Sequence, residues 1–392
     1  MSHAPSAALS RRHRLVREAL GRAGLDALVV TSLPNILYLT NFTGSSAIVV
    51  IDAERVRFIT DFRYTAAIAA SRATAAACPG LDLVTVDGSY DATLASTIAA
   101  APGMRVGFEA AHMSVARHQW IAAAIANQPR EDAASDSDGP ALASVALVPT
   151  EGIVERTRVR KDEYEIAVVR KAARLLSNVA REVLGDIRRG RSERETAAAI
   201  DFRMRKAGFD KPAFDTIVAS GPQAALPHAR PTERTITEGD LVVLDFGGVY
   251  DSYCVDLTRT VVVGRAGSRV REVYDAVRAA HDSAIAAVAP GRSRFDIDAA
   301  ARDTLAAAGL GDAFGHGTGH GLGIEVHEDP RVSRRRPDVD ARDEAVASGM
   351  IFTIEPGAYL PGWGGIRIED DVLVTEGGVE VLTDVTTDLV EV

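Results

Sequence analysis

Residues 241–260 read LVVLDFGGVYDSYCVDLTRT, two apolar runs that each hold one acidic residue, Asp245 in the first and Asp256 in the second. Runs rich in Val, Leu and aromatic residues predict β-strands. Joined as a hairpin whose turn is centred between Tyr250 and Asp251, the strands would place Asp245 directly opposite Asp256. Directly opposed residues share a face, with Cβ atoms about 5 Å apart. We therefore expect two carboxylates side by side in an apolar setting.

Two buried carboxylates repel each other, so one of them keeps its proton unless a cation lies between them. Exposure of both acids, or a shared proton, is the alternative interpretation, and the flanking Val and Leu residues disfavour exposure. Two further apolar runs each lead into an acid, residues 351–354 into Glu355 and residues 366–368 into Glu369. Four carboxylates are therefore associated with predicted strands.

A histidine-rich segment supplies a different kind of ligand. Residues 314–328 read FGHGTGHGLGIEVHE and hold three of the nine histidines together with five glycines. Glycine lets the backbone approach a ligand closely, and histidine is the commonest metal ligand. A glycine-rich surface loop with incidental histidines is the alternative, and carboxylate partners elsewhere in the chain favour the metal interpretation.

These segments together offer one imidazole and four carboxylates as candidate metal ligands. This set is too acidic for a structural zinc site, which prefers Cys and His. It suits hard or borderline divalent cations such as manganese, and a pair of them better than one. Two cations about 3.5–4 Å apart can generate a hydroxide nucleophile at neutral pH. The five candidates are Asp245, Asp256, His320, Glu355 and Glu369.

Composition limits the class of protein. A chain of 392 residues favours two domains. The net charge of −10 disfavours nucleic acids and anionic membranes as partners, because both require a basic surface. Two cysteines cannot form a disulfide framework. The first 15 residues lack the apolar stretch of a secretory signal, and no apolar run approaches the roughly 20 residues of a membrane helix, so we expect a cytoplasmic protein.

The first domain is expected at residues 1–150. Val-, Ile- and Phe-rich runs predict strands at residues 26–31, 47–52, 56–61 and 105–109. Helices are predicted at residues 11–20, 65–76, 92–101 and 114–126. This alternation indicates an α/β layer domain. The polar residues 127–140 predict a loop before residues 144–148 close the domain, and the boundary is expected near residues 149–152.

The second domain is expected at residues 151–392. Asp162 and Glu165 have the spacing of a capping box, as do Ser192 and Glu195. An apolar stripe predicts that the first of these helices runs to Gly190, and the second stops at Gly208. Further helices are predicted at residues 268–289 and 295–308. Strands are predicted at residues 213–219, 241–247, 253–262, 350–355 and 365–374, which suggests an α+β domain.

Five motifs carry a resemblance to a known family. LDFGG, VDLTRT, GTGHGLG, IEPGAY and GIRIED stand in that order between residues 241 and 371. They resemble the pita-bread metallopeptidases, which include aminopeptidase P, prolidase, methionine aminopeptidase and the metal-free creatinase. Residues 153–161 resemble the usual entry to the catalytic domain. The resemblance implies an α+β pita-bread catalytic domain preceded by a smaller α/β creatinase-type N-terminal domain, to which the first domain is loosely similar.

The resemblance also implies roles for the five candidate ligands. Asp245 would chelate one metal ion, Asp256 and Glu369 would bridge two, and His320 and Glu355 would hold the second ion. Glu355 would in addition take a proton from the attacking water. The ions implied are two divalent cations, Mn²⁺ first, with Co²⁺, Zn²⁺ or Fe²⁺ as alternatives. Because all five ligands are present, the chain departs from the creatinase branch.

Four further residues match family positions around the substrate. His228 matches a substrate-binding histidine, His327 one that steadies the tetrahedral intermediate, His316 one near the proline pocket, and Arg367 a partner behind the ligands. A single histidine is more often structural, but these positions are fixed relative to the five ligands. One departure is Gln223, where the family often has Asn.

The activity that the resemblance implies is that of an Xaa-Pro aminopeptidase, which hydrolyses the N-terminal Xaa-Pro bond of a peptide by attack of a metal-bridging hydroxide. His327 and the ions would stabilise the oxyanion, and Glu355 and His228 would move protons. The substrates implied are peptides with proline in second position. A homodimer is also implied, with the partner's first domain bordering the pocket.

Three alternatives stay open at this stage. An Xaa-Pro dipeptidase, or prolidase, would need groups that hold the free carboxylate of a dipeptide, and the sequence does not distinguish it from the aminopeptidase. A methionine aminopeptidase is disfavoured by the additional first domain. A non-catalytic binding module on the same fold is disfavoured by the intact set of five ligands.

Overall fold

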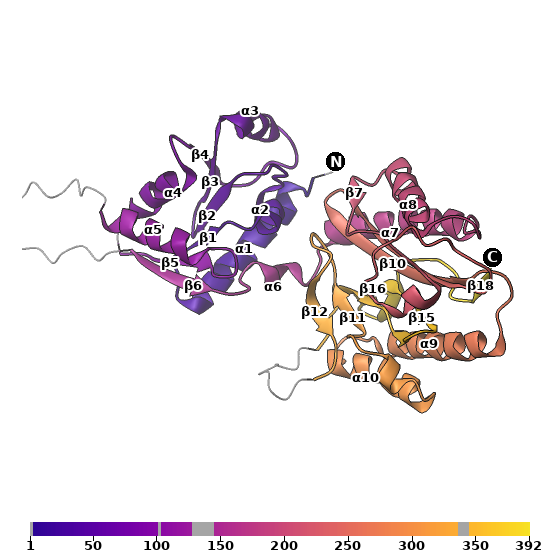
Figure 1. Cartoon of the computed structure of the whole chain (residues 1–392). Coiled ribbons are helices and arrows are strands. Elements are labelled where there is room, and N and C mark those ends of the chain that lie inside the picture. The colour runs from indigo at the N-terminus through magenta and orange to yellow at the C-terminus, as the bar shows by residue number, and fades with distance from the viewer. Residues whose placement is uncertain (1–2, 101–102, 128–144, 336–344) are drawn as a thin grey trace, which may run out of the picture. The chain divides into compact units, whose positions relative to one another are not determined.

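The computed structural model describes residues 3–100, 103–127, 145–335 and 345–392 (Figure 1). The chain divides into two compact units, Met1–Arg158 and Val159–Val392. The predicted loop at residues 127–140 lies, from residue 128 onward, outside the described residues. Among the described helices, none is both long and apolar enough to span a membrane.

The first unit is built on a six-stranded mixed sheet of order β4-β3-β2-β1-β5-β6. Its strands are β1 (Ala27–Val30), β2 (Ile48–Asp52), β3 (Val56–Thr60), β4 (Leu81–Thr85), β5 (Arg105–Glu109) and β6 (Ala146–Thr150). Its helices are α1 (Ser6–Ala23), α2 (Leu33–Thr40), α3 (Phe62–Ser71), α4 (Tyr90–Ala99), α5 (Val115–Ala126) and α6 (Glu155–Arg158). The predicted α/β layer architecture is confirmed.

Helix α2 and strand β4 were not predicted from the sequence. The two residues that precede α2 are held by a distant carboxylate: Glu109 accepts hydrogen bonds from the backbone N–H of Thr31 at 2.6 Å and of Ser32 at 2.8 Å. The side chain of Asn35 donates to the same carboxylate at 2.6 Å. Because Glu109 comes from β5, this helix start depends on a tertiary contact that local sequence patterns do not report.

Two helices of the second unit begin where their capping residues predicted, and the other two begin at or within one residue of the predicted start. They are α7 (Glu163–Leu184), α8 (Glu193–Ala207), α9 (Ser268–Ala287) and α10 (Arg294–Ala307). Both capping boxes form, with Asp162 and Ser192 each exchanging hydrogen bonds with the acid three residues later. The first helix ends earlier than the predicted Gly190, although Ile187 still packs into the core beyond its end.

Two five-stranded sheets and one two-stranded sheet make up the rest of the second unit. The first sheet holds β7 (Lys211–Pro212), β8 (Ile217–Ser220), β9 (Leu241–Tyr250), β10 (Tyr253–Val262) and β18 (Val390–Glu391). The second holds β11 (Gly319–Gly321), β12 (Glu328–Val332), β13 (Ile351–Ile354), β16 (Asp370–Thr375) and β17 (Gly378–Val381), and β14 (Gly357–Leu360) pairs with β15 (Gly364–Arg367).

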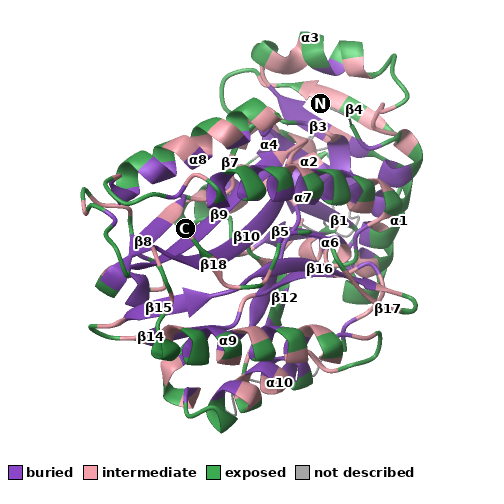
Figure 2. Cartoon of the chain, turned by 90° about the vertical axis from the view of Figure 1, so that its right-hand side faces the viewer, coloured by how far each residue is buried: buried purple, intermediate pink, exposed green. Residues whose placement is uncertain are grey.

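Buried strands lie between two pairs of helices in this unit, α7 with α8 on one side and α9 with α10 on the other (Figure 2). The helices turn exposed faces outward, whereas β9 and β10 are buried almost throughout. Burial on both faces explains why these strands read as nearly continuous apolar runs. The acids that interrupt them are therefore held inside the domain, and the α+β prediction is confirmed.

The register of the β9–β10 hairpin corrects one prediction. Tyr250 pairs with Tyr253, so Asp245 faces Thr258 and the predicted direct opposition of Asp245 and Asp256 is wrong. The turn is centred one residue later than expected, on Asp251 and Ser252, whose φ angles of 46° and 73° are those of a tight hairpin turn. The resulting two-residue shift keeps both acids on one face, because side chains alternate with period two.

Candidate metal centre

All nine predicted site residues line one pocket of about 650 Å³ in the second unit. Asp245 and Asp256 come from the β9–β10 hairpin, His320 from β11, and Glu355 and Glu369 from positions next to β13 and β16. The five candidate ligands in the pocket are thus up to 124 positions apart in the chain, Asp245 and Glu369 being the most distant of them. The remaining predicted residues in its lining are His228, His316, His327 and Arg367.

Three of the predicted ligands form a tight group. Donor atoms of Asp256, His320 and Glu369 all lie within 4.8 Å of one another, and all three residues are buried. His320 Nε2 lies 4.0 Å from Asp256 Oδ2 and 3.8 Å from Glu355 Oε1. An imidazole nitrogen and carboxylate oxygens of several strands therefore converge on one small volume.

Several oxygens of the proposed ligands have unused acceptor capacity. Asp245 Oδ1, Asp256 Oδ1 and Glu369 Oε1 are buried and accept no hydrogen bond within the described part of the chain. Buried polar atoms almost always have a partner, and an unsatisfied one costs free energy. A set of orphaned carboxylate oxygens around one imidazole is what a divalent cation would satisfy, so these residues fit the implied metal ions.

Burial sets the ionisation of these acids in the absence of a cation. Desolvation, together with the charges of neighbouring acids, raises the pKa values of Asp256 and Glu369 well above their ordinary range. Desolvation also raises the pKa of Glu355 to about 8, against the opposing effect of Arg367. A bound divalent cation reverses this preference, since it is the largest charge in such a site. Binding of a cation would therefore release protons.

His320 is held in the form that binds a metal. Its Nδ1 lies 3.1 Å from the carbonyl oxygen of Gly321, and a proton on Nδ1 leaves the Nε2 lone pair directed at the carboxylates. Burial lowers the pKa of His320 to about 3, so the ring is neutral at physiological pH. The close approach of β11 to β13 requires Gly319, where an added Cβ would lie 1.8 Å from the carbonyl oxygen of Thr353.

Arg367 connects the acids to the substrate side of the pocket. Its Nη2 pairs with Asp245 Oδ2, and its Nη1 donates to the hydroxyl of Tyr359 at 2.7 Å and to the carbonyl of Pro227 at 3.2 Å. The contact with the Pro227 carbonyl anchors the loop that carries His228. His316 Nε2 lies 2.9 Å from the same Tyr359 hydroxyl, so a chain of polar contacts runs from Asp245 to His316.

Three residues of the pocket region had no predicted role. The hydroxyl of Thr258 donates to Glu369 Oε2 at 2.6 Å, and Tyr359 joins Arg367 to His316. Thr258 lies in the motif VDLTRT and Tyr359 in the motif IEPGAY, so their places in these motifs could have marked them as site residues. Arg331 lines the pocket from β12, and nothing in its surrounding sequence distinguishes it from a surface arginine.

The two remaining histidines, His228 and His327, also line the pocket. The ring of His327 packs against that of His320 with centroids 4.3 Å apart, and both His327 and His228 are exposed residues of the pocket lining. Gln223, the departure from the family pattern, donates to the hydroxyl of Thr232 at 3.4 Å.

Comparison with protein-family models gives two matches. Residues 167–376 match the model of metallopeptidase family M24, and residues 12–160 match the Creatinase/Prolidase N-terminal domain. Together the matches cover both units of the fold. The resemblance predicted from the five motifs is confirmed.

Individual relatives agree with these matches. The uncharacterised peptidase YqhT of Bacillus subtilis is 38% identical over 94% of this chain and 96% of its own length. An Xaa-Pro dipeptidase of Pyrococcus furiosus is 42% identical over 59% of this chain and 65% of its own.

Solved structures match nearly the whole chain. An Xaa-Pro dipeptidase from Bacillus anthracis superposes with a TM-score of 0.88 at 34% identity, covering 98% of this chain and 100% of the other. An X-Pro aminopeptidase from Thermotoga maritima superposes with a TM-score of 0.82 at 32% identity, covering 97% and 100%. The chain therefore belongs to metallopeptidase family M24, with a creatinase-type N-terminal domain ahead of a pita-bread catalytic domain.

Proposed function

We propose that this metallopeptidase hydrolyses Xaa-Pro bonds with two divalent cations, Mn²⁺ first among them. The ligands proposed are Asp245, Asp256, His320, Glu355 and Glu369. The observation that carries the proposal is that Asp256 and Glu369, which lie close to a ring nitrogen of His320, each have a buried carboxylate oxygen that accepts no hydrogen bond from the residues described. The family supports metal-dependent peptide hydrolysis, and the ligand set supports hard or borderline cations.

The cations, when bound, would supply a hydroxide at neutral pH and polarise the scissile carbonyl. The chain's own residues perform the remaining tasks. The side chain of Glu355 is 19% exposed, so solvent can reach it. Glu355 would accept the proton of the attacking water. His327 would donate a hydrogen bond to the carbonyl oxygen as negative charge develops there. His228, on the loop anchored by Arg367, would hold the substrate and return a proton to the leaving nitrogen.

His316 and Tyr359 would form one wall of the proline site. Burial lowers the pKa of His316 to about 4, so its ring is neutral and suited to contact with a pyrrolidine. Its Nδ1 lies 2.8 Å from the carbonyl oxygen of Gly317, and its Nε2 lies 2.9 Å from the Tyr359 hydroxyl, which fixes the ring plane. A fixed wall of this kind orients the peptide bond before proline toward the metal ligands.

Arg331 favours a dipeptide over a longer peptide. It is exposed, it lines the pocket, and it makes no close ion pair with a carboxylate of the described residues, although its charge acts on Glu355 and opposes the rise in the pKa of that acid. An exposed guanidinium at a substrate pocket that forms no close ion pair within the described part of the chain suits the free carboxylate of an Xaa-Pro dipeptide. We therefore favour an Xaa-Pro dipeptidase over the aminopeptidase expected from the sequence. The aminopeptidase is the second candidate, because the Thermotoga enzyme is nearly as similar as the Bacillus one.

A substrate comparison with added Mn²⁺ separates the two candidates. We expect kcat/KM for an Xaa-Pro dipeptide to exceed that for the matching Xaa-Pro-Yaa tripeptide by at least about tenfold. Arg331→Gln should raise KM for the dipeptide by about 10- to 100-fold, since hydrogen bonds to charged groups contribute about 1.5–3 kcal/mol. Arg334→Gln, which neutralises an exposed arginine three residues further on, should leave KM unchanged.

Two results would change the assignment. Preferred turnover of the tripeptide, with no effect of Arg331→Gln, would make the chain an aminopeptidase. Turnover of neither peptide by Mn²⁺-loaded protein would remove Xaa-Pro specificity altogether. The creatinase-type first domain continues to disfavour a methionine aminopeptidase. The predicted homodimer stays a prediction, which light scattering on the purified protein would test.

A further inference from the structure

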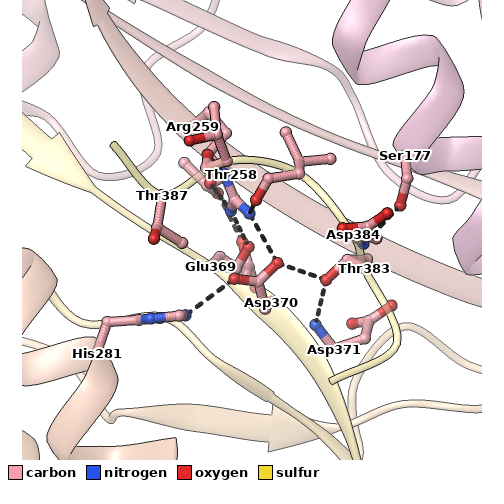
Figure 3. Close-up of polar contacts among 12 residues, drawn as sticks. Ser177, Thr258, Arg259, His281, Glu369, Asp370, Asp371, Thr383, Asp384 and Thr387 are labelled. Carbon is pink, nitrogen blue, oxygen red and sulfur yellow. Dashed lines mark hydrogen bonds and ion pairs between the residues drawn. The ribbon is translucent and has the colours of Figure 1, made fainter. Parts of the chain in front are cut away.

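Arg259 is a buried arginine that does not itself line the pocket but contacts the backbone on which two proposed ligands stand (Figure 3). Its Nη1 donates to the carbonyl oxygen of Thr258 at 3.0 Å and to that of Glu369 at 2.7 Å. Thr258 follows Asp256 by two residues on β10, and the backbone N–H of Glu369 donates to the Thr258 carbonyl at 3.1 Å. The guanidinium therefore joins the strand of one proposed bridging ligand to the backbone of the other.

The remaining donors of Arg259 are fixed from the opposite side. Its Nε donates to the carbonyl of Thr386 at 2.8 Å, and its Nη2 donates to the carbonyl of Val385 and to Asp370 Oδ1, each at 2.8 Å. A guanidinium has five N–H donors, and these five contacts account for all of them. The planar group is thus held in one orientation by the C-terminal segment while it holds Thr258 and Glu369.

Asp370 secures this arrangement from inside the protein. It adjoins Glu369 in sequence, and Figure 3 shows its carboxylate among Arg259, Thr383 and His281. The Thr383 hydroxyl donates to Asp370 Oδ1 at 2.5 Å, and His281 Nε2 of helix α9 lies 3.0 Å from Asp370 Oδ2. The side chains of Arg259, Asp370 and His281 are each at most 3% exposed. Such a buried, multiply bonded ion pair has little freedom to rearrange.

We propose that Arg259, oriented by Asp370, is a positioning residue that sets the separation of the Asp256 and Glu369 carboxylates and thereby the affinity for metal ions. The carboxylate of Glu369 is further oriented by the Thr258 hydroxyl, so Arg259 fixes its backbone and Thr258 its side chain. This inference rests on the proposed metal centre. Groups behind metal ligands commonly change metal affinity by about 10- to 100-fold when they are replaced.

Arg259→Lys tests the proposal because it keeps the positive charge and removes the planar fork. A lysine has three donors on one atom and cannot hold two carbonyls and a carboxylate in one plane. We expect the Kd for Mn²⁺, measured by calorimetry on metal-free full-length protein, to increase by about 10- to 100-fold. Activity at limiting Mn²⁺ should fall by the same factor and recover at saturating Mn²⁺, while KM for the peptide stays unchanged.

Arg234→Lys is the matched control. Arg234 pairs with Asp240 through two hydrogen bonds of 2.7 and 2.8 Å and donates to Ser220 in the same domain, but it is not part of the pocket lining. This variant should lose stability and keep the Mn²⁺ affinity of the unaltered protein. Asp370→Asn provides a second test that preserves side-chain shape, and it should also weaken Mn²⁺ binding.

The outcomes separate this inference from the proposed metal centre. If the unaltered protein binds no Mn²⁺, the metal centre itself is wrong. If the unaltered protein binds Mn²⁺ and Arg259→Lys and Asp370→Asn bind it equally tightly, only the positioning role is wrong. If Arg259→Lys does not fold, Asp370→Asn alone decides, and an unchanged Mn²⁺ affinity in that variant overturns the proposal.

Discussion

Asp256→Asn is expected to abolish tight Mn²⁺ binding and to lower kcat/KM by about a thousand-fold or more. The substitution keeps the shape of the side chain and removes the charge from the centre of the Asp256, His320 and Glu369 group. A metal ion contributes several kcal/mol of transition-state stabilisation, and each 1.4 kcal/mol corresponds to a factor of ten. Hydrolysis of an Xaa-Pro dipeptide in the presence of Mn²⁺ measures the loss.

The same substitution, although it should impair metal binding and turnover, should not lower the stability of the metal-free protein. Without a cation, Asp256 adds to a cluster of buried acids whose pKa values are raised by desolvation and by one another. Removing one ionisable group relieves that cost, so the urea midpoint in EDTA should stay the same or increase. With Mn²⁺ added, only the unaltered protein should gain stability, because a ligand that binds the native state stabilises it.

Asp275→Asn is the control for this experiment. It makes the same chemical change at an exposed position on α9, where Asp275 lies 3.6 Å from Arg278. Exposed ion pairs contribute little, so activity and Mn²⁺-dependent stabilisation should match those of the unaltered protein. Full activity of Asp256→Asn at ordinary Mn²⁺ concentrations would contradict the assignment of Asp256 as a ligand.

Arg367→Gln is expected to produce the second large effect, on stability as well as on turnover. The guanidinium is 3% exposed and contacts Asp245, Tyr359, Thr258 and the carbonyl of Pro227. Removing one partner of a buried ion pair typically costs about 3–5 kcal/mol, because the other charge is left uncompensated. Urea unfolding in EDTA should report a loss of that size.

Turnover should also fall in this variant, because the Pro227 carbonyl would lose the contact that anchors the loop carrying His228. Arg367→Lys should retain part of the stability and little of the turnover, since an ammonium cannot reproduce the fork. Arg181→Gln removes an exposed arginine that pairs with Asp384 and should cost at most about 1 kcal/mol. A loss no larger for Arg367→Gln than for Arg181→Gln would show that Arg367 does not support the acids.

The sequence was a better guide to which side chains come together than to how the strands that carry them pair. Asp245 and Asp256 each interrupt an apolar run, and such an acid must be buried with the strand around it. The predicted register was wrong because Asp251 and Ser252 occupy left-handed conformations without the Asn-Gly or Asp-Gly sequence that usually indicates such a turn. The error of two residues kept the shared face, so the conclusion about the two acids survived.

Other features of the fold and the site depend on long-range contacts that local sequence patterns do not predict. Arg259 stands in a predicted strand, but its hydrogen-bond acceptors include backbone carbonyls of residues up to 127 positions away. Because every residue has a backbone carbonyl, the sequence does not indicate which of them Arg259 contacts. The start of α2 likewise depends on Glu109, 77 residues after Ser32. Arg331 gave no signal, because its place in the pocket follows from the course of β12 and not from its neighbours in the chain.

The central claim is that four acids and one imidazole enclose divalent cations, and anomalous diffraction from crystals grown with Mn²⁺ tests it most directly. We predict two anomalous peaks in the pocket, about 3.5–4 Å apart. Both should lie within bonding distance of Asp256 and Glu369, with His320 Nε2 bound to one of them. Crystals of active, Mn²⁺-loaded protein with no peak in this pocket, or with peaks only at surface carboxylates, would contradict the claim.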